Sequence, residues 1–226
     1  MTTLSAPVPP ARPGGSGWWG WLLRALGLDA GFQQKPVASR AGREERVFLL
    51  IGLPANSGAN AALLAEALSE CMATIRASGG EVAGQKNGNI WLAWPAGLGE
   101  RQAIAVYFQL HNCLRRRSHP AELLGAAGLG WVKPGRAWSG LRYRGDVLGS
   151  VAGILRESQQ VGGLLVSAAL RQRVDRELPF RYELHVGFNL PGHSYPATLY
   201  RVAPEALAAD LQPHEPIAQL QESSAL

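Results

Sequence analysis

The stretch "GGEVAGQKNGNIWLAWP", residues 79–95, has the pattern of two short strands joined by a tight turn. Asn-Gly near its middle is the dipeptide that most strongly favours a two-residue hairpin turn. The second strand, residues 89–95, alternates well enough to be half or fully buried. Gly79 and Gly80, at the start of the stretch, end the helix that precedes it. The stretch therefore predicts a helix followed by a β-hairpin, with Asn89 at the beginning of the second strand.

The residues around this hairpin complete a pattern of strands and helices. Residues 46–53 are a continuous apolar run that suits a buried central strand, and Leu64, Leu68, Met72 and Ile75 form one apolar stripe of a helix. After the hairpin we expect, in order, a helix over residues 98–117, a strand over 122–135, a helix over 145–160, a strand over 162–167, a short helix over 168–175, and strands over 181–188 and 196–203. This order predicts an α+β fold with a ferredoxin-like βαββαβ core, a mostly antiparallel sheet and helices on one face.

The two ends of the chain differ in composition from its centre. Residues 1–44 are rich in Pro, Gly and Ser apart from one apolar stretch, so we expect this segment to be disordered. The apolar strand patterns occupy residues 45–203, which we expect to form the folded domain. The composition turns polar after that, and residues 204–226 are expected to form a loose tail.

The apolar stretch of the N-terminal segment is residues 17–28, "GWWGWLLRALGL", which contains Trp18, Trp19 and Trp21. Its apolar residues fall at helical spacing on one face. Three alternatives remain open for it: a helix packed on its own domain, an anchor at a membrane surface, or a helix that binds a protein partner.

Composition and charge limit the classes of function. The chain has 226 residues, of which 46% are apolar and 17% are charged, enough for one domain with a sizeable core. The formal net charge is +5, but the basic residues are scattered, so we do not expect nucleic-acid binding. Cys71 and Cys113 are far apart and indicate two free buried thiols in a reducing cytoplasm. Without a signal-peptide pattern or a spanning apolar stretch, we predict a cytoplasmic protein, with peripheral membrane attachment left open.

Six stretches in the chain resemble the class III nucleotidyl cyclase catalytic domain, the adenylate and guanylate cyclase fold. They occur in the correct order and at sensible spacing over most of residues 45–203. The stretches are "RVFLLIGLPANSG" (46–58), "ASGGEVAGQKNGNIWLAWP" (77–95), "LLGAAGLGWVKPG" (123–135), "LRYRGDVLGSVAGIL" (141–155), "LLVSAALRQRV" (164–174) and "LPGHSYPATLYRV" (190–202). The resemblance implies the cyclase fold and a site that forms between two subunits.

The resemblance also implies a chemistry that depends on two metal ions held by two aspartates. The ions bridge the triphosphate and activate the ribose hydroxyl for attack on the α-phosphate. In this chain the first aspartate position falls at Gly52 and the second at Asn89. Mg²⁺ prefers carboxylate ligands, and we expect Glu44, Glu45 and Glu81 to be solvated surface charges and not replacements. The resemblance therefore implies that this chain holds no metal and no cofactor.

The other functional positions of the family are also replaced. The adenine-selecting lysine falls at Gln85, or at Lys86 if the register of the hairpin differs by one, and its partner falls at Arg142. The asparagine and the arginine that stabilise the transition state fall at Gly149 and Gly153, and the phosphate-binding lysine falls at Pro191. We expect none of these residues to be catalytic.

These replacements predict a catalytically inactive cyclase homology domain that acts as a signalling or regulatory interaction module. Its partners would be a second copy of the chain, another protein, or a membrane surface contacted through residues 17–28. Two alternatives remain. The first is a nucleotide sensor without turnover, in which Arg142, Arg144 and Lys133 lie near the vestigial cleft. The second is a divergent active cyclase that uses ATP or GTP.

Overall fold

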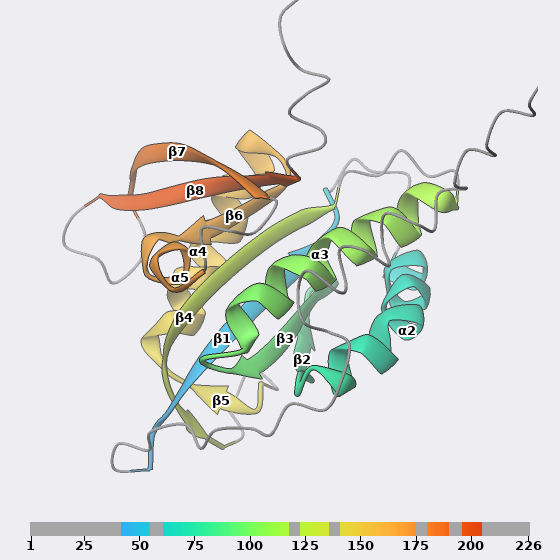
Figure 1. Ribbon diagram of the computed structural model, residues 1–226, viewed down its shortest axis with the longest axis horizontal. Coiled ribbons are helices and arrows are strands. Elements are labelled where there is room, and N and C mark those ends of the chain that lie inside the picture. Colours follow the sequence, from blue (N-terminus) through green and yellow to red (C-terminus); the bar gives the residue numbers. More distant parts are fainter. Residues whose placement is uncertain are drawn as a thin grey trace, which may run out of the picture.

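The computed structural model of the protein describes residues 42–54, 61–117, 123–135, 141–174, 180–189 and 196–204 (Figure 1). The predictions made for residues 17–28, for most of residues 1–44 and for nearly all of residues 204–226 lie outside this part of the chain. No helix in the described part is long and apolar enough to cross a membrane.

The first half of the domain is a ferredoxin-like βαββαβ unit. Its elements are β1 (Glu44–Gly52), α2 (Ala61–Ala77), β2 (Glu81–Lys86), β3 (Asn89–Pro95), α3 (Gly99–Arg116) and β4 (Leu124–Pro134). The four strands lie in the order β2-β3-β1-β4, and each neighbouring pair is antiparallel. The predicted α+β fold and its core are confirmed.

The second half of the domain extends this sheet beyond β4. Its elements are β5 (Tyr143–Arg144), α4 (Asp146–Val161), β6 (Leu164–Ser167), α5 (Ala168–Arg173), β7 (Phe180–Phe188) and β8 (Ala197–Pro204). Strand β6 runs parallel to β4, and the antiparallel strands β8 and β7 follow it. The short strand β5 pairs with β4 outside this path and was not predicted. The sheet is mostly antiparallel, as expected.

The helices cover both faces of the sheet, so the prediction that they all lie on one face is wrong. Val47, Leu49 and Ile51 of β1 belong to the core cluster that includes residues of α2, α3 and α5. Phe48 and Leu50, which point to the other side of the same strand, belong to a second cluster together with residues of α4. Figure 1 shows α3 in front of the sheet and α4 behind it. The physical reason is that α4 lies outside the βαββαβ unit and crosses from β4 to the parallel strand β6 over the uncovered face.

Candidate functional site

The two positions where the resemblance places metal-binding aspartates lie side by side in the structure. Gly52 is the last residue of β1, and Asn89 is the first residue of β3, the strand next to it. A Cβ atom built on Gly52 would overlap Oδ1 of the Asn89 side chain. The same Cβ atom would lie 3.7 Å from Cδ2 of Leu155 in helix α4. The amide of Asn89 therefore fills the space that a side chain at position 52 would need. We call this pair the Gly52–Asn89 site.

This site does not fit a pair of divalent cations. Gly52 has no side chain, and Asn89 offers one neutral oxygen where Mg²⁺ prefers carboxylate oxygens. Within the described ranges, no group of three or more His, Cys, Asp and Glu side chains could hold a metal ion. The structure therefore gives no basis for a reaction step through metal ions at this site.

The register of the hairpin places Lys86, and not Gln85, on the side of the sheet where Asn89 lies. Lys86 pairs with Asn89 across a turn in which Asn87 and Gly88 both have positive φ, 52° and 77°. Gln85 pairs with Ile90, whose side chain belongs to the cluster on the α2 and α3 side.

A β-bulge between Val82 and Gly84 causes this arrangement. A bulge inserts one extra residue into a strand and reverses the faces of the residues that follow it. The resemblance leaves Gln85 and Lys86 as alternatives for the adenine-selecting position, and the register puts Lys86 on the Asn89 side of the sheet and Gln85 on the other side. Which of the two takes that role stays a prediction.

Arg142 is held by an acidic residue of strand β2. Its guanidinium lies 3.3 Å from Oε2 of Glu81, and its backbone N–H donates to the carbonyl of Ala83 at 3.0 Å. Glu81 also accepts hydrogen bonds from Nη1 of Arg46, at 3.1 Å, and from the hydroxyl of Tyr143. Because Glu81 is two-thirds buried and binds three donors, the prediction that it is a solvated surface charge is wrong.

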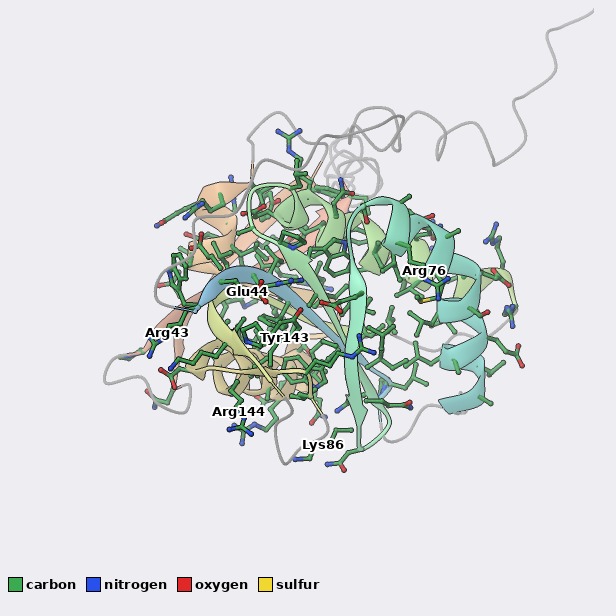
Figure 2. All side chains as sticks on the ribbon, turned by 90° about the horizontal axis from the view of Figure 1, so that it is seen from below. Arg43, Glu44, Arg76, Lys86, Tyr143 and Arg144 are labelled. Atoms are coloured by element: carbon green, nitrogen blue, oxygen red, sulfur yellow. The ribbon has the colours of Figure 1, made fainter. Side chains whose placement is uncertain are left out.

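Tyr143 is the buried member of this Glu81 cluster. Its ring packs against Phe48 at 5.6 Å between centroids, and the guanidinium of Arg46 lies 5.0 Å from its centroid. Burial, followed by the hydrogen bond to Glu81, raises the pKa of the Tyr143 hydroxyl, so the residue is a neutral donor at physiological pH. Figure 2 shows Tyr143 in the interior, whereas the next residue, Arg144, projects outward.

Lys133 and Arg144 are remote from the Gly52–Asn89 site of the same chain, and whether they lie near a cleft shared by two subunits stays a prediction. They face each other in the β4–β5 pair, next to Val132, which pairs with Glu44 at the start of β1. Gly52 is at the opposite end of β1. At a rise of about 3.3 Å per residue, the length of β1 separates the two places by about 26 Å.

Helix α4 carries glycine at both positions where the resemblance places the transition-state residues. Gly149 is exposed, and a Cβ atom built on it would have nothing within 4 Å. Gly153, four residues later on the same helical face, is buried. Neither residue can offer a side-chain donor or a charge to a neighbouring molecule. Pro191, the remaining position of this set, lies outside the described residues.

Comparisons with known proteins identify the fold. No protein-family model and no curated protein matches the chain. Among solved structures, the adenylyl cyclase CyaB from P. aeruginosa is 13% identical, with a TM-score of 0.55 over 71% of this chain and 94% of that chain. A bacterial light-regulated adenylyl cyclase is 17% identical, with a TM-score of 0.54 over 73% of this chain and 94% of that one.

A third similar structure is the guanylate cyclase domain of RhGC from Catenaria anguillulae in complex with GTP. It is 12% identical, with a TM-score of 0.56 over 73% of this chain and 99% of that chain. The matches cover 94% of the adenylyl cyclase CyaB and 99% of the guanylate cyclase domain, nearly the whole of each. The chain has the fold of a class III adenylyl or guanylyl cyclase catalytic domain.

Proposed function

We propose that the protein is a catalytically inactive nucleotidyl cyclase homology domain that acts as a regulatory interaction module. The observation that carries the proposal is the Gly52–Asn89 site, where a neutral amide fills the space beside a glycine. Both carboxylates of the family's metal site are absent from it. Glycine at positions 149 and 153 removes the transition-state contacts as well.

The size of these losses supports an inactive domain. Removal of one transition-state hydrogen-bond donor lowers the rate of an enzyme by about 10²–10³. A metal ion in such a site contributes several kcal/mol of charge stabilisation, and this chain offers no anionic ligand for it there. The metal ions and the hydrogen-bond donors stabilise the same transition state. A domain that lacks both should therefore react far more slowly than an active cyclase.

The test is an assay of the purified full chain with Mn²⁺ and either ATP or GTP, with a catalytic domain of known activity as the positive control. We expect no cyclic nucleotide above the buffer blank. The proposal would be overturned by steady production that is proportional to protein concentration and is lost in the Asn89→Ala variant. Production that persists in Asn89→Ala and still co-purifies with the chain would also overturn the proposal, because other residues of the protein would then carry the reaction.

As an interaction module, the domain needs a partner, and the chemistry of the sequence offers two. One is a second copy of the chain, because the family builds its site between two subunits; light scattering of the full chain across a concentration series would detect the dimer. The other is a membrane surface bound through the tryptophans of residues 17–28. Co-sedimentation with liposomes that is lost on deletion of residues 17–28 would support that contact.

A second candidate function is a nucleotide sensor without turnover, and the position of Lys86 favours it. Lys86 is a cation at one of the two positions where the resemblance places the adenine-selecting lysine. The hairpin register puts it on the Asn89 side of the sheet. A ligand that binds only the folded state raises its stability. The sensor predicts that ATP or GTP raises the melting temperature of the wild type and not of Lys86→Ala. Lys133→Ala, at the remote end of β4, is the matched control and keeps the shift. No shift in the wild type would exclude the sensor.

A further inference from the structure

The two cysteines meet at the interface between α2 and α3, although the sequence indicated two separate thiols. Cys71 is in α2 and Cys113 is in α3, 42 residues apart in the chain, and their sulfur atoms are 3.9 Å apart. Both residues are buried, with exposed fractions of 0% and 2%, within the core cluster that also holds Leu64, Ile75 and Leu110. They are the only cysteines of the chain.

The surroundings of the pair differ for the two sulfurs. Nη2 of Arg116 donates to Sγ of Cys113 at 3.1 Å, and the Arg116 side chain is 71% exposed. Cys113 is therefore one side chain below the surface, in contact with the Arg116 guanidinium and hydrogen-bonded to the carboxylate of Glu70. Burial, followed by the neighbouring Cys113, raises the pKa of the Cys71 thiol, so Cys71 is protonated at neutral pH.

The surroundings also exclude a metal centre. The described residues supply no third His, Cys, Asp or Glu ligand with which the two sulfurs could hold a metal ion. The chemistry open to two neighbouring thiols with no other ligand is oxidation to a disulfide.

We propose that Cys71 and Cys113 form a reversible intramolecular disulfide that fastens α2 to α3. The bond needs the two sulfurs to approach from 3.9 Å to about 2.05 Å, a displacement within reach of side-chain rotation and a small shift of the helices. The pair lies on the α2 and α3 side of the sheet, away from the Gly52–Asn89 site, so the proposal does not depend on whether that site binds or turns over a nucleotide.

The oxidant is a low-molecular-weight disulfide such as glutathione disulfide. Cys113, the sulfur nearer to solvent, loses its proton and attacks one sulfur of the oxidant; a mixed disulfide forms and one glutathione thiolate leaves. Cys71 then loses its proton and attacks Sγ of Cys113, which releases the second glutathione. The two cysteines lose two electrons and two protons, and one glutathione disulfide becomes two glutathione thiols.

The bond would restrict the part of the chain that carries the hairpin. Strands β2 and β3, including Asn89, lie between the two cysteines. A disulfide that closes a loop of this length restricts the unfolded chain and raises the stability of the folded one. For a domain of this size the melting temperature is expected to rise by about 4–16 °C.

The experiment uses the full chain, purified under reductant and then equilibrated without denaturant in buffers of graded reduced and oxidised glutathione. We expect oxidation to give a monomer lighter than the reduced protein by the mass of two hydrogen atoms, with no thiol left to alkylate. Proteolysis without reductant should yield a peptide that links residues 71 and 113. The melting temperature should rise in the same buffers and return on addition of dithiothreitol.

Cys71→Ala is the matched control, because alanine leaves no polar atom in the core. In this variant, glutathione disulfide should not change the melting temperature. Cys113 should remain a free thiol or carry one glutathione. Three results for the wild type would each overturn the proposal: both thiols free under excess oxidant, a glutathione adduct on each cysteine, or a disulfide only between two chains. A link that forms only in denaturant would also overturn it, since the folded geometry would then play no part.

Discussion

Replacement of Gly125 by alanine should destabilise the domain markedly, because this glycine lets strand β4 lie against helix α3. A Cβ atom at position 125 would lie 2.5 Å from Cε2 and 2.6 Å from Cδ2 of Tyr107, and 2.9 Å from Cδ1 of Leu164. The backbone of Gly125 cannot retreat easily, since its N–H donates to the carbonyl of Gly163 at 3.0 Å. The new methyl group must therefore displace the Tyr107 ring.

The ring of Tyr107 is itself held in place. It is 2% exposed, its hydroxyl donates to the carbonyl of Leu123 at 2.5 Å, and it packs edge-on against Phe108 with 5.2 Å between centroids. Overpacking of a core costs about 1–3 kcal/mol, and loss of the buried hydrogen bond adds about 1 kcal/mol. The reduced entropy of the unfolded chain returns about 0.4–1 kcal/mol. The net loss should be about 1–3.5 kcal/mol, which lowers the melting temperature by roughly 2–14 °C.

The assay is urea unfolding of the full chain, followed by tryptophan fluorescence and by circular dichroism. Gly149→Ala is the matched control, because it makes the same chemical change at an exposed position of helix α4. A Cβ atom built there has nothing within 4 Å. Alanine is the better helix former, so Gly149→Ala should stabilise the domain by about 0.5–1 kcal/mol. The reasoning is refuted if Gly125→Ala unfolds at the urea concentration of the wild type, or if the two variants shift in the same direction.

Two tyrosines give further predictions, with free energies of unfolding from urea titrations as the readout. Among the described residues the hydroxyl of Tyr182 is buried without a hydrogen-bond partner, so Tyr182→Phe should stabilise the domain by about 1 kcal/mol at neutral pH. Burial, opposed by Arg171, raises the pKa of Tyr182 to about 12. An unfolded tyrosine ionises near pH 10, so the free energy of unfolding of the wild type should fall between about pH 10 and 12. In Tyr182→Phe this contribution to the fall should be absent. The same decrease of the free energy of unfolding with pH in both proteins would contradict this. In contrast, Tyr143→Phe removes a donor to Glu81 and should cost about 1–2 kcal/mol, and a neutral result would show that this hydrogen bond adds nothing.

The order of strands and helices could be predicted because the signals are local. The Asn-Gly dipeptide forms the turn in which Asn87 and Gly88 have positive φ. Gly79 ends α2 with its N–H bonded to the carbonyl of Arg76 at 2.9 Å. Ser167 accepts a hydrogen bond from the N–H of Leu170 at the start of α5. The closeness of Gly52 and Asn89 also follows from the pairing of β1 with β3, which the βαββαβ pattern implies.

The features that could not be predicted depend on contacts between distant segments. The β-bulge at Val82 and Gly84 leaves no clear mark in the sequence, yet it decides that Lys86 and not Gln85 shares a side of the sheet with Asn89. The role of Glu81 depends on arginines and a tyrosine from β1 and from the residues around β5. The face of the sheet that α4 covers depends on the crossover from β4 to β6. The apolar stripe of α4 alone does not decide which face is covered. A missed strand of two residues, β5, is too short for any periodicity to show.

The most direct test of the account is an anomalous scattering measurement at the manganese edge, on crystals of the full chain soaked with Mn²⁺ and a non-cleavable ATP analogue. We expect no manganese peak within coordination distance of Asn89, because a neutral amide beside a glycine cannot replace two carboxylates. Two manganese peaks between Gly52, Asn89 and the triphosphate would contradict it.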